Sequence, residues 1–284
     1  MGELVCRRPH PRLRGYVLAY RGFRFAEVMA HRRRIVVPDG NVKIMVGFGQ
    51  PVRVVDARTP ERSVTAPSLV TGIRATAAIG EHTGGAHGIL ILLTPMAAYR
   101  IFGIPAPEWS DLHDDPLGLL GPPARSLAER LVACVSWDER FAELDYLLES
   151  RMALGPSFVP EVVGAWRALR RSSGTLRISD LANASGWSRR HFERRFRAHM
   201  GVTAKEAAQI VRLQAALQLR RMGSSWARVA AELGYHDQPH FDHTFRAMVG
   251  CTPGSFQESR SGVAFDAAQD FLPGHVSSAL LSGC

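Results

Sequence analysis

Arg190, Glu193 and Arg194 have the side-chain types and the spacing that base readout in DNA requires. The planar fork of arginine matches the O6 and N7 acceptors of guanine, and glutamate accepts a hydrogen bond from N4 of cytosine. Phe192 and Phe196 lie four residues apart, so on a helix they form one buried face and leave the polar side chains outside. The pattern therefore predicts that these three polar residues contact bases.

A second segment repeats this arrangement. Residues 182–203, the first unit, match residues 230–253, the second unit, at an offset of 48 to 49 positions. In the second unit, glutamine suits adenine and histidine can donate to purine acceptors. The candidates for base contact in this unit are Gln238, His240 and His243. Asp242 repels phosphate, so we expect the second unit to read DNA less strongly than the first.

Each unit has the form of a helix-turn-helix, with a short apolar helix, a turn at a glycine and an aromatic residue, and a second helix with a polar outer face. Ser188 and Asp237 are placed to cap the second helices, and Pro239 needs no backbone donor in a first turn. Thr203–Glu206 is a capping box that opens a connecting helix to about Met222. That helix spans roughly 28 Å, and successive turns of the major groove lie about 34 Å apart. One chain can then reach two half-sites.

The positive charge of the chain gathers on the segment that holds both units. Residues 161–260 contain 16 Lys plus Arg against 8 Asp plus Glu, whereas the other 184 residues contain 19 against 18. Such a segment attracts a polyanion such as DNA, with an affinity that falls with salt. The candidates for phosphate contact are Arg189, Arg195, Arg197, Arg212, Arg221 and Arg246. The alternative is that Glu193 and Arg197 pair on a solvated helix face.

The N-terminal part is rich in short strands. Ile35–Val37 precedes the turn signal Pro38–Gly40, Val42–Val46 alternates apolar residues with Lys43 and Met45, and Gly88–Leu93 is a continuous apolar run. We predict an α+β fold, with an N-terminal β-barrel or cupin-like domain, a helical extension, and an all-α domain in which a linker helix joins two helix-turn-helix units. The predicted parts are a β-rich sensory or dimerisation domain at 1–107, the extension at 108–160, the DNA-binding domain at 161–260 and a flexible tail at 261–284.

Other kinds of site find little support in the sequence. The four cysteines form no CxxC pair, and no apolar run reaches the ~18 residues of a membrane helix. His236, His240 and His243 lack an accompanying carboxylate or thiolate, and Glu81, His82 and His87 lack the close HxH pair of a cupin metal site. No nucleophile motif such as GxSxG is present. We therefore expect no enzyme activity, no metal, no cofactor, no membrane contact and a cytoplasmic location.

The stretch from Ile178 to Phe256 resembles the DNA-binding domain of the AraC/XylS transcription regulators. The residues that carry the resemblance are Trp226, Ala230, Leu233-Gly234-Tyr235, His240-Phe241, Phe245-Arg246, Gly250, Pro253 and Phe256. The resemblance implies that the first recognition helix makes the main base contacts and that the second lies near bases. It also implies that the N-terminal barrel senses a small molecule or dimerises. Pro239 and Asp242 depart from the groups that many relatives direct at phosphate or bases.

The sequence thus predicts a sequence-specific, effector-controlled transcription regulator. Its expected partners are promoter DNA bound in the major groove, a small-molecule effector, a second copy of the chain, and RNA polymerase if the regulator activates. Two alternatives stay open. One is a metal-dependent cupin-type enzyme with a DNA-targeting domain, and the other is an architectural protein that binds any duplex.

Overall fold

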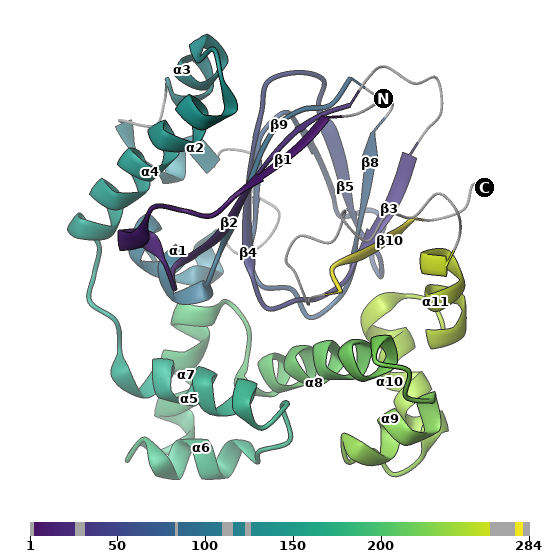
Figure 1. The fold of residues 1–284 in the computed structure, drawn as a ribbon. Helices are drawn as coiled ribbons and strands as arrows, with labels where there is room; N and C mark the ends of the chain where they lie inside the picture. Colours follow the sequence, from purple (N-terminus) through teal and green to yellow (C-terminus); the bar gives the residue numbers. More distant parts are fainter. Residues whose placement is uncertain are drawn as a thin grey trace.

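The structure is a computed structural model that describes residues 3–25, 32–82, 85–109, 116–122, 126–261 and 276–280. It has an N-terminal domain of antiparallel sheets and a C-terminal helical domain with two helix-turn-helix units (Figure 1). The predicted α+β class is confirmed.

Two five-stranded antiparallel sheets form the N-terminal domain. The first has the order β1 (Glu3–Arg7), β2 (Val17–Arg24), β9 (His87–Leu93), β4 (Val42–Gly47) and β7 (Leu69–Thr71). The second has the order β10 (Ser278–Leu280), β3 (Arg32–Val36), β8 (Ala78–His82), β5 (Val52–Asp56) and β6 (Ser63–Ala66).

The alternation in β4 decides which side chains face the space between the sheets. Ile44 is fully buried and pairs in register with Ile91 of β9. Successive side chains of a strand point to opposite faces. Lys43 and Met45, which alternate with Ile44, line a cavity on the other face of the strand. The strand therefore separates an apolar core from a partly polar cavity.

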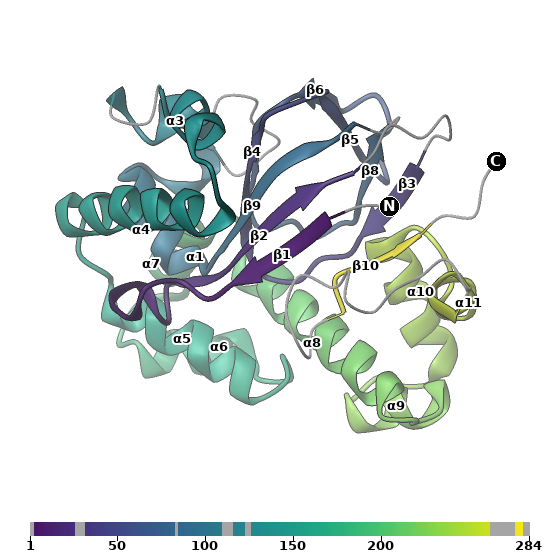
Figure 2. The ribbon, with the colours of Figure 1, turned by 45° about the horizontal axis from the view of Figure 1, so that its top comes forward.

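Helices cover one side of the first sheet (Figure 2). They are α1 (Pro95–Phe102), α2 (Pro116–Leu119), α3 (Leu127–Ala133) and α4 (Trp137–Leu154), with short 3₁₀ turns at Pro11–Leu13 and Ala106–Glu108. The first of these helices begins before the predicted extension, because Thr94 caps it by accepting from Ala97 N. Ser136 caps α4 by accepting from Glu139 N at 3.2 Å, and the Glu139 side chain accepts in turn from Val135 N at 3.0 Å.

The helical domain runs from α5 to α11. Its helices are α5 (Pro160–Arg171), α6 (Ile178–Ala184), α7 (Arg189–Met200), α8 (Ala204–Arg221), α9 (Trp226–Glu232), α10 (Gln238–Val249) and α11 (Pro253–Ser261). The capping box of Thr203 and Glu206 opens α8, as predicted. With 18 residues, α8 is about 27 Å long, and it runs beneath the sheets between the two units (Figure 1). None of the helices in the described part of the chain has the length and apolar character that crossing a membrane requires.

The C-terminal end differs from the flexible tail predicted for residues 261–284. Ser278–Leu280 pair with the edge strand β3, and the side chains of Ser277 and Ser278 are buried (Figure 2). The edge of β3 offers unpaired backbone groups that a distant segment can satisfy. Sequence periodicity gave no sign of this strand, because its partner lies more than 240 residues away. The prediction is wrong for residues 276–280.

Candidate nucleic-acid interface

The first unit places its recognition helix α7 with one face buried. Gly186 takes φ +71° in the turn, and Ser188 Oγ accepts a hydrogen bond from His191 N at 3.3 Å, so α7 starts as predicted. Phe192 and Phe196 are fully buried. Because that face is fixed, the arginines between them must point elsewhere.

Most of the predicted DNA contacts of α7 are exposed. Arg189, Arg190, Arg194 and Arg197 all reach solvent, and the Arg194 guanidinium lies 3.4 Å from His191 Nδ1. The helix thus presents a row of guanidinium groups on the side away from its phenylalanines. Such a row can donate to base edges and to phosphate oxygens.

Glu193 and Arg195 are less exposed than the other predicted contact residues of α7. Glu193 is half-buried, and its Oε2 accepts from Ala204 N at the start of α8, at 3.3 Å. Arg195 is half-buried as well, and its carbonyl lies 2.8 Å from His199 Nδ1. In this structure Glu193 joins the recognition helix to the linker helix.

The second unit repeats the backbone of the first. Gly234 takes φ +71° in its turn. Asp237 caps α10 by accepting from His240 N at 2.8 Å. This backbone N–H holds the pKa of Asp237 below its ordinary value, and the His236 side chain at 3.0 Å adds to the effect. Phe241 and Phe245 take the places of the two phenylalanines of α7.

The outer face of α10 carries little positive charge. Gln238, His240, His243 and Arg246 are exposed, as base and phosphate contacts must be. Asp242 is half-buried, and its Oδ1 has no hydrogen-bond partner among the described residues. The predicted residues of α7 and those of α10 lie on separate helices, with α8 between the two units (Figure 1).

Two further predicted phosphate contacts lie on α8. Arg212 is half-buried, donates to Gly174 O at 2.8 Å, and stacks over the Tyr235 ring at 5.5 Å. Burial raises the pKa of Tyr235, and the charge of Arg212 opposes that rise. Arg212 therefore joins the loop before the first unit to the turn of the second. Arg221 is exposed and donates to Gln218 at 3.2 Å.

Both recognition helices end against the N-terminal domain. These contacts were not predicted from the sequence. At the end of α7, His199 is buried and its ring centroid lies 4.1 Å from that of Tyr99 in α1. Burial lowers the pKa of His199. At the end of α10, Met248 O accepts from Ala77 N at 2.7 Å. No local signal marks these contacts, because each joins segments that are far apart in the sequence.

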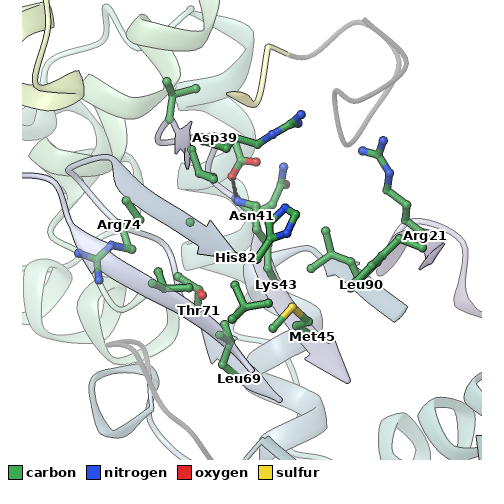
Figure 3. Close-up of a pocket in the computed structure, with 18 of the residues that line it drawn as sticks. Arg21, Asp39, Asn41, Lys43, Met45, Leu69, Thr71, Arg74, His82 and Leu90 are labelled. Carbon is green, nitrogen blue, oxygen red and sulfur yellow. Dashed lines mark hydrogen bonds and ion pairs between the residues drawn. The ribbon is translucent and has the colours of Figure 1, made fainter. Parts of the chain in front are cut away.

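A cavity of about 410 Å³ lies between the two sheets (Figure 3). Its walls combine apolar side chains with polar ones. They include Asn41, Lys43, Met45, Leu69 and Leu90. The alternation of Lys43 and Met45 with buried aliphatic residues was the available sequence signal for this space.

The residues discounted as metal ligands are used otherwise. Glu81 forms ion pairs with Arg33 at 2.9 Å and Arg53 at 2.8 Å. The His87 ring packs edge-on against Phe48 and Trp137. Across the residues that the structure describes, no three His, Cys, Asp or Glu side chains are grouped as metal ligands would be.

Known proteins match the helical domain. A family model described as a helix-turn-helix domain matches residues 181–259. PqrA of Proteus vulgaris, named as a transcription factor, is 33% identical over 92 residues, which are 32% of this chain and 75% of PqrA. YkgA of Escherichia coli (strain K12), named as an HTH-type transcriptional regulator, is 33% identical over 81 residues, 28% of this chain and 34% of YkgA. The match thus spans about a third of YkgA.

Among solved structures, unsaturated fatty acid bound wild-type ToxT from Vibrio cholerae strain SCE256 aligns with 92% of this chain and 100% of ToxT. The TM-score is 0.48 and the sequence identity is 13%.

The repeated units, their capped recognition helices and the match to most of PqrA agree with one another. The residues on which the resemblance to AraC/XylS regulators is based form the turn, the buried face and the end of the second unit. The chain belongs to the AraC/XylS family of DNA-binding transcription regulators.

Proposed function

We propose that this regulator recognises a specific promoter sequence in the major groove, chiefly through α7. The observation that carries the proposal is the exposure of Arg190 and Arg194 on a helix whose opposite face is fixed by Phe192 and Phe196. A fixed helix holds each guanidinium fork at a defined place, and bidentate pairing with guanine requires that.

The second unit adds weaker contacts. We propose base contacts by Gln238, His240 and His243, and phosphate contacts by Arg189, Arg195, Arg197, Arg221 and Arg246. Glu193 and Arg212 act differently in this proposal: each bonds to protein backbone and sets the position of a unit relative to α8. The DNA-binding domain then comprises residues 161–260, as the charge distribution indicates.

Replacement of Arg194 by alanine tests base readout. We expect a loss of about 1–3 kcal/mol on the preferred duplex and a relaxed preference at one base position, measured by binding to a set of single-base variants. Arg12→Ala is the charge-matched control, because Arg12 is 80% exposed on the N-terminal domain. A uniform loss over all duplexes would make Arg194 a phosphate contact and contradict its role as a base reader.

We further propose that a small molecule in the barrel cavity controls DNA binding. The segment Val37–Asn41 lines that cavity and also touches the helical domain. Pro38 O accepts from Gln214 Nε2 of α8 at 2.8 Å. Gly40, at φ +74°, packs so closely on α5 that a Cβ there would lie 3.0 Å from the Trp166 ring. A ligand that moves this segment therefore acts on the helix that joins the two units.

Gln214→Leu tests this connection. Gln214 is only 7% exposed and cannot reach DNA, yet it bonds to both Pro38 and Val276. We expect the variant to change the DNA affinity about threefold or more, the effect of losing one buried hydrogen bond. Gln209→Leu on the same helix is the control, and equal DNA affinity of the Gln214 variant and the parent would contradict the connection.

Self-association is also part of the proposal. Val135, which precedes α4, and Tyr146, which lies within it, are 90% and 76% exposed, and this exposure supports contact with a second copy. Sedimentation over a range of concentrations tests it, and a monomer at every concentration, with and without DNA, would contradict it. RNA polymerase is a partner only if the regulator activates.

A further inference from the structure

The strand β10, which follows the DNA-binding domain in the sequence, is part of an N-terminal sheet. It pairs antiparallel with β3, with Ser278 opposite Val36. Val37 N extends the ladder by donating to Ser277 O at 3.0 Å. Without β10, β3 would be the edge of the second sheet and its backbone groups on that side would be open.

The helical domain holds the same strand from two helices. From α8, Gln214 Nε2 donates to Val276 O at 3.0 Å and to Pro38 O at 2.8 Å, so one amide group joins the strand to the neighbouring N-terminal segment. From α11, Arg260 Nη1 donates to Ser278 O. Figure 1 shows β10 between β3 and α11. The strand is therefore bonded to the sheet, to the linker helix and to α11 together.

Burial distinguishes this strand from a tail that lies loosely on the surface. Val276, Ser277 and Ser278 are 3%, 1% and 0% exposed. The hydroxyl of Ser278 accepts from Arg34 Nη1 at 2.9 Å. A slip of the strand by one residue would turn Ser278 to the other face and break this buried hydrogen bond. The pairing of β10 with β3 therefore has one favoured register.

The two units are attached to the N-terminal domain in different ways. The first unit contacts α1 through the rings of His199 and Tyr99. The bonds from β10 reach the helical domain at α8 and α11. Phe256 of α11 packs against Phe245 of α10, with ring centroids 5.8 Å apart. A force on β10 is thus passed to the recognition helix of the second unit.

We infer that β10 is a strap that ties the second helix-turn-helix unit to the N-terminal domain and holds it at a fixed place relative to the first unit. With the strap in place, two blocks of DNA sequence meet an arrangement that is already formed. Without the strap, binding to both blocks must also order the second unit, and that ordering weakens binding. The effect on DNA rests on the proposed function of the two units, whereas the attachment itself is measured without DNA.

Hydrogen exchange of the full-length protein tests the attachment. Ala279 stands opposite Ile35 in β3, and proline at this position cannot donate to the ladder. We expect Ala279→Pro to speed amide exchange about threefold or more at Val37 and in α9–α11, and to leave α6–α7 unchanged. Ala279→Val, which keeps the backbone N–H and suits a strand, is the matched control and is expected to exchange like the parent.

A milder variant leaves the sheet intact. Arg260→Met keeps an apolar stem and loses the bond to Ser278 O. We expect it to speed exchange in α9–α11 and to leave Val37 as in the parent. This pattern separates release of the second unit from damage to the sheet.

Binding to two duplexes tests the consequence for DNA. One duplex carries both sequence blocks that the parent prefers, and the other carries only the block read by α7. Ala279→Pro is expected to weaken binding to the first duplex about threefold to tenfold and to leave the second unchanged. Hydrogen exchange decides the attachment even if the parent shows no sequence preference, so failure of base readout is a separate result.

The inference is overturned if Ala279→Pro leaves exchange in α9–α11 at the parent rate, or speeds it equally in α6–α7. It is also overturned if the variant binds the two-block duplex as tightly as the parent does, or loses the same affinity for both duplexes.

Discussion

The two helix-turn-helix units share a backbone and differ in charge. Gly186 and Gly234 take the same φ of +71° in the turns, and both recognition helices end at a left-handed glycine. Yet α7 contains five arginines and one glutamate, while α10 contains one arginine and one aspartate. The buried face sets the fold of each unit, and the outer face is free to vary. One backbone frame therefore carries two outer faces of different charge.

On this account α7 provides most of the affinity and the base readout, and α10 fixes the orientation on DNA. Each phosphate contact releases counterions, so the DNA affinity falls as the salt concentration rises. The arginine-rich helix α7 should therefore dominate this salt dependence. Both helices end against the N-terminal domain, at Tyr99 and at Ala77. The N-terminal domain therefore contacts both units at once, through α1 and through the residue that precedes β8.

The largest expected effect comes from removing the base readers of each unit in turn. Arg190→Ala with Arg194→Ala is expected to weaken specific binding by about 100-fold or more, because each guanine contact contributes about 1–3 kcal/mol. His240→Ala with His243→Ala is expected to cost about tenfold or less. Titration of each pair against the preferred duplex measures both, and equal losses would break the proposed difference between the units.

The salt dependence of DNA affinity provides a second comparison of α7 with α10. Replacing Arg189, Arg195 and Arg197 by glutamine is expected to reduce the slope of log affinity against log salt by about three, since each lost phosphate contact removes about one. Arg246→Gln on α10 is expected to reduce it by about one. Binding at several salt concentrations gives both slopes. If the α7 triple variant kept the parent slope, its arginines would not contact phosphate.

Arg212 joins the loop before the first unit to the turn of the second, so its replacement should lower the stability of the protein. Arg212→Met loses the bond to Gly174 O and the stacking on Tyr235, and keeps a similar apolar stem. We expect the free energy of unfolding to fall by about 1–2 kcal/mol, measured by urea denaturation. Arg221→Met, at an exposed position on the same helix, is the control. An Arg212 variant as stable as the parent would argue that the residue is available for phosphate.

The smallest effect is a pH dependence at the end of α7. Burial lowers the pKa of His199 in the folded protein, while Arg195 O holds its Nδ1 at 2.8 Å. The unfolded chain therefore takes up the proton first, and stability is lost as the pH falls below about 6.5, with a slope of at most ~1.4 kcal/mol per pH unit. Among the described residues, Tyr99 and Arg195 also face the ring.

His199→Phe should abolish that part of the pH dependence. Unfolding by urea between pH 5 and pH 7 would compare the variant with the parent. Identical pH profiles for the two proteins would show that His199 is protonated equally in the folded and unfolded states.

The local parts of this fold could be predicted from the sequence. Ser188, Asp237 and the Thr203–Glu206 box each depend on residues three positions apart, so the pattern alone specifies the hydrogen bonds. The outer faces of α7 and α10 followed from the spacing of their phenylalanines. DNA contact by the residues on those faces remains a prediction.

The long-range parts could not be predicted. Ser278–Leu280 fill the edge of β3, and Glu193 and Arg212 bond to backbone groups that no local pattern places beside them. The cavity between the sheets depends on which strands face each other, and Asn41 carries no signal of burial in its own segment. These features arise from packing between segments that are distant in the chain.

The most direct test of the central claim is selection of duplexes from a randomised library by the full-length protein at near-physiological salt, followed by sequencing. We expect two enriched blocks about one helical turn apart, with the stronger block lost in the Arg190→Ala, Arg194→Ala variant. Equal recovery of all sequences by the full-length protein would contradict sequence-specific readout by α7.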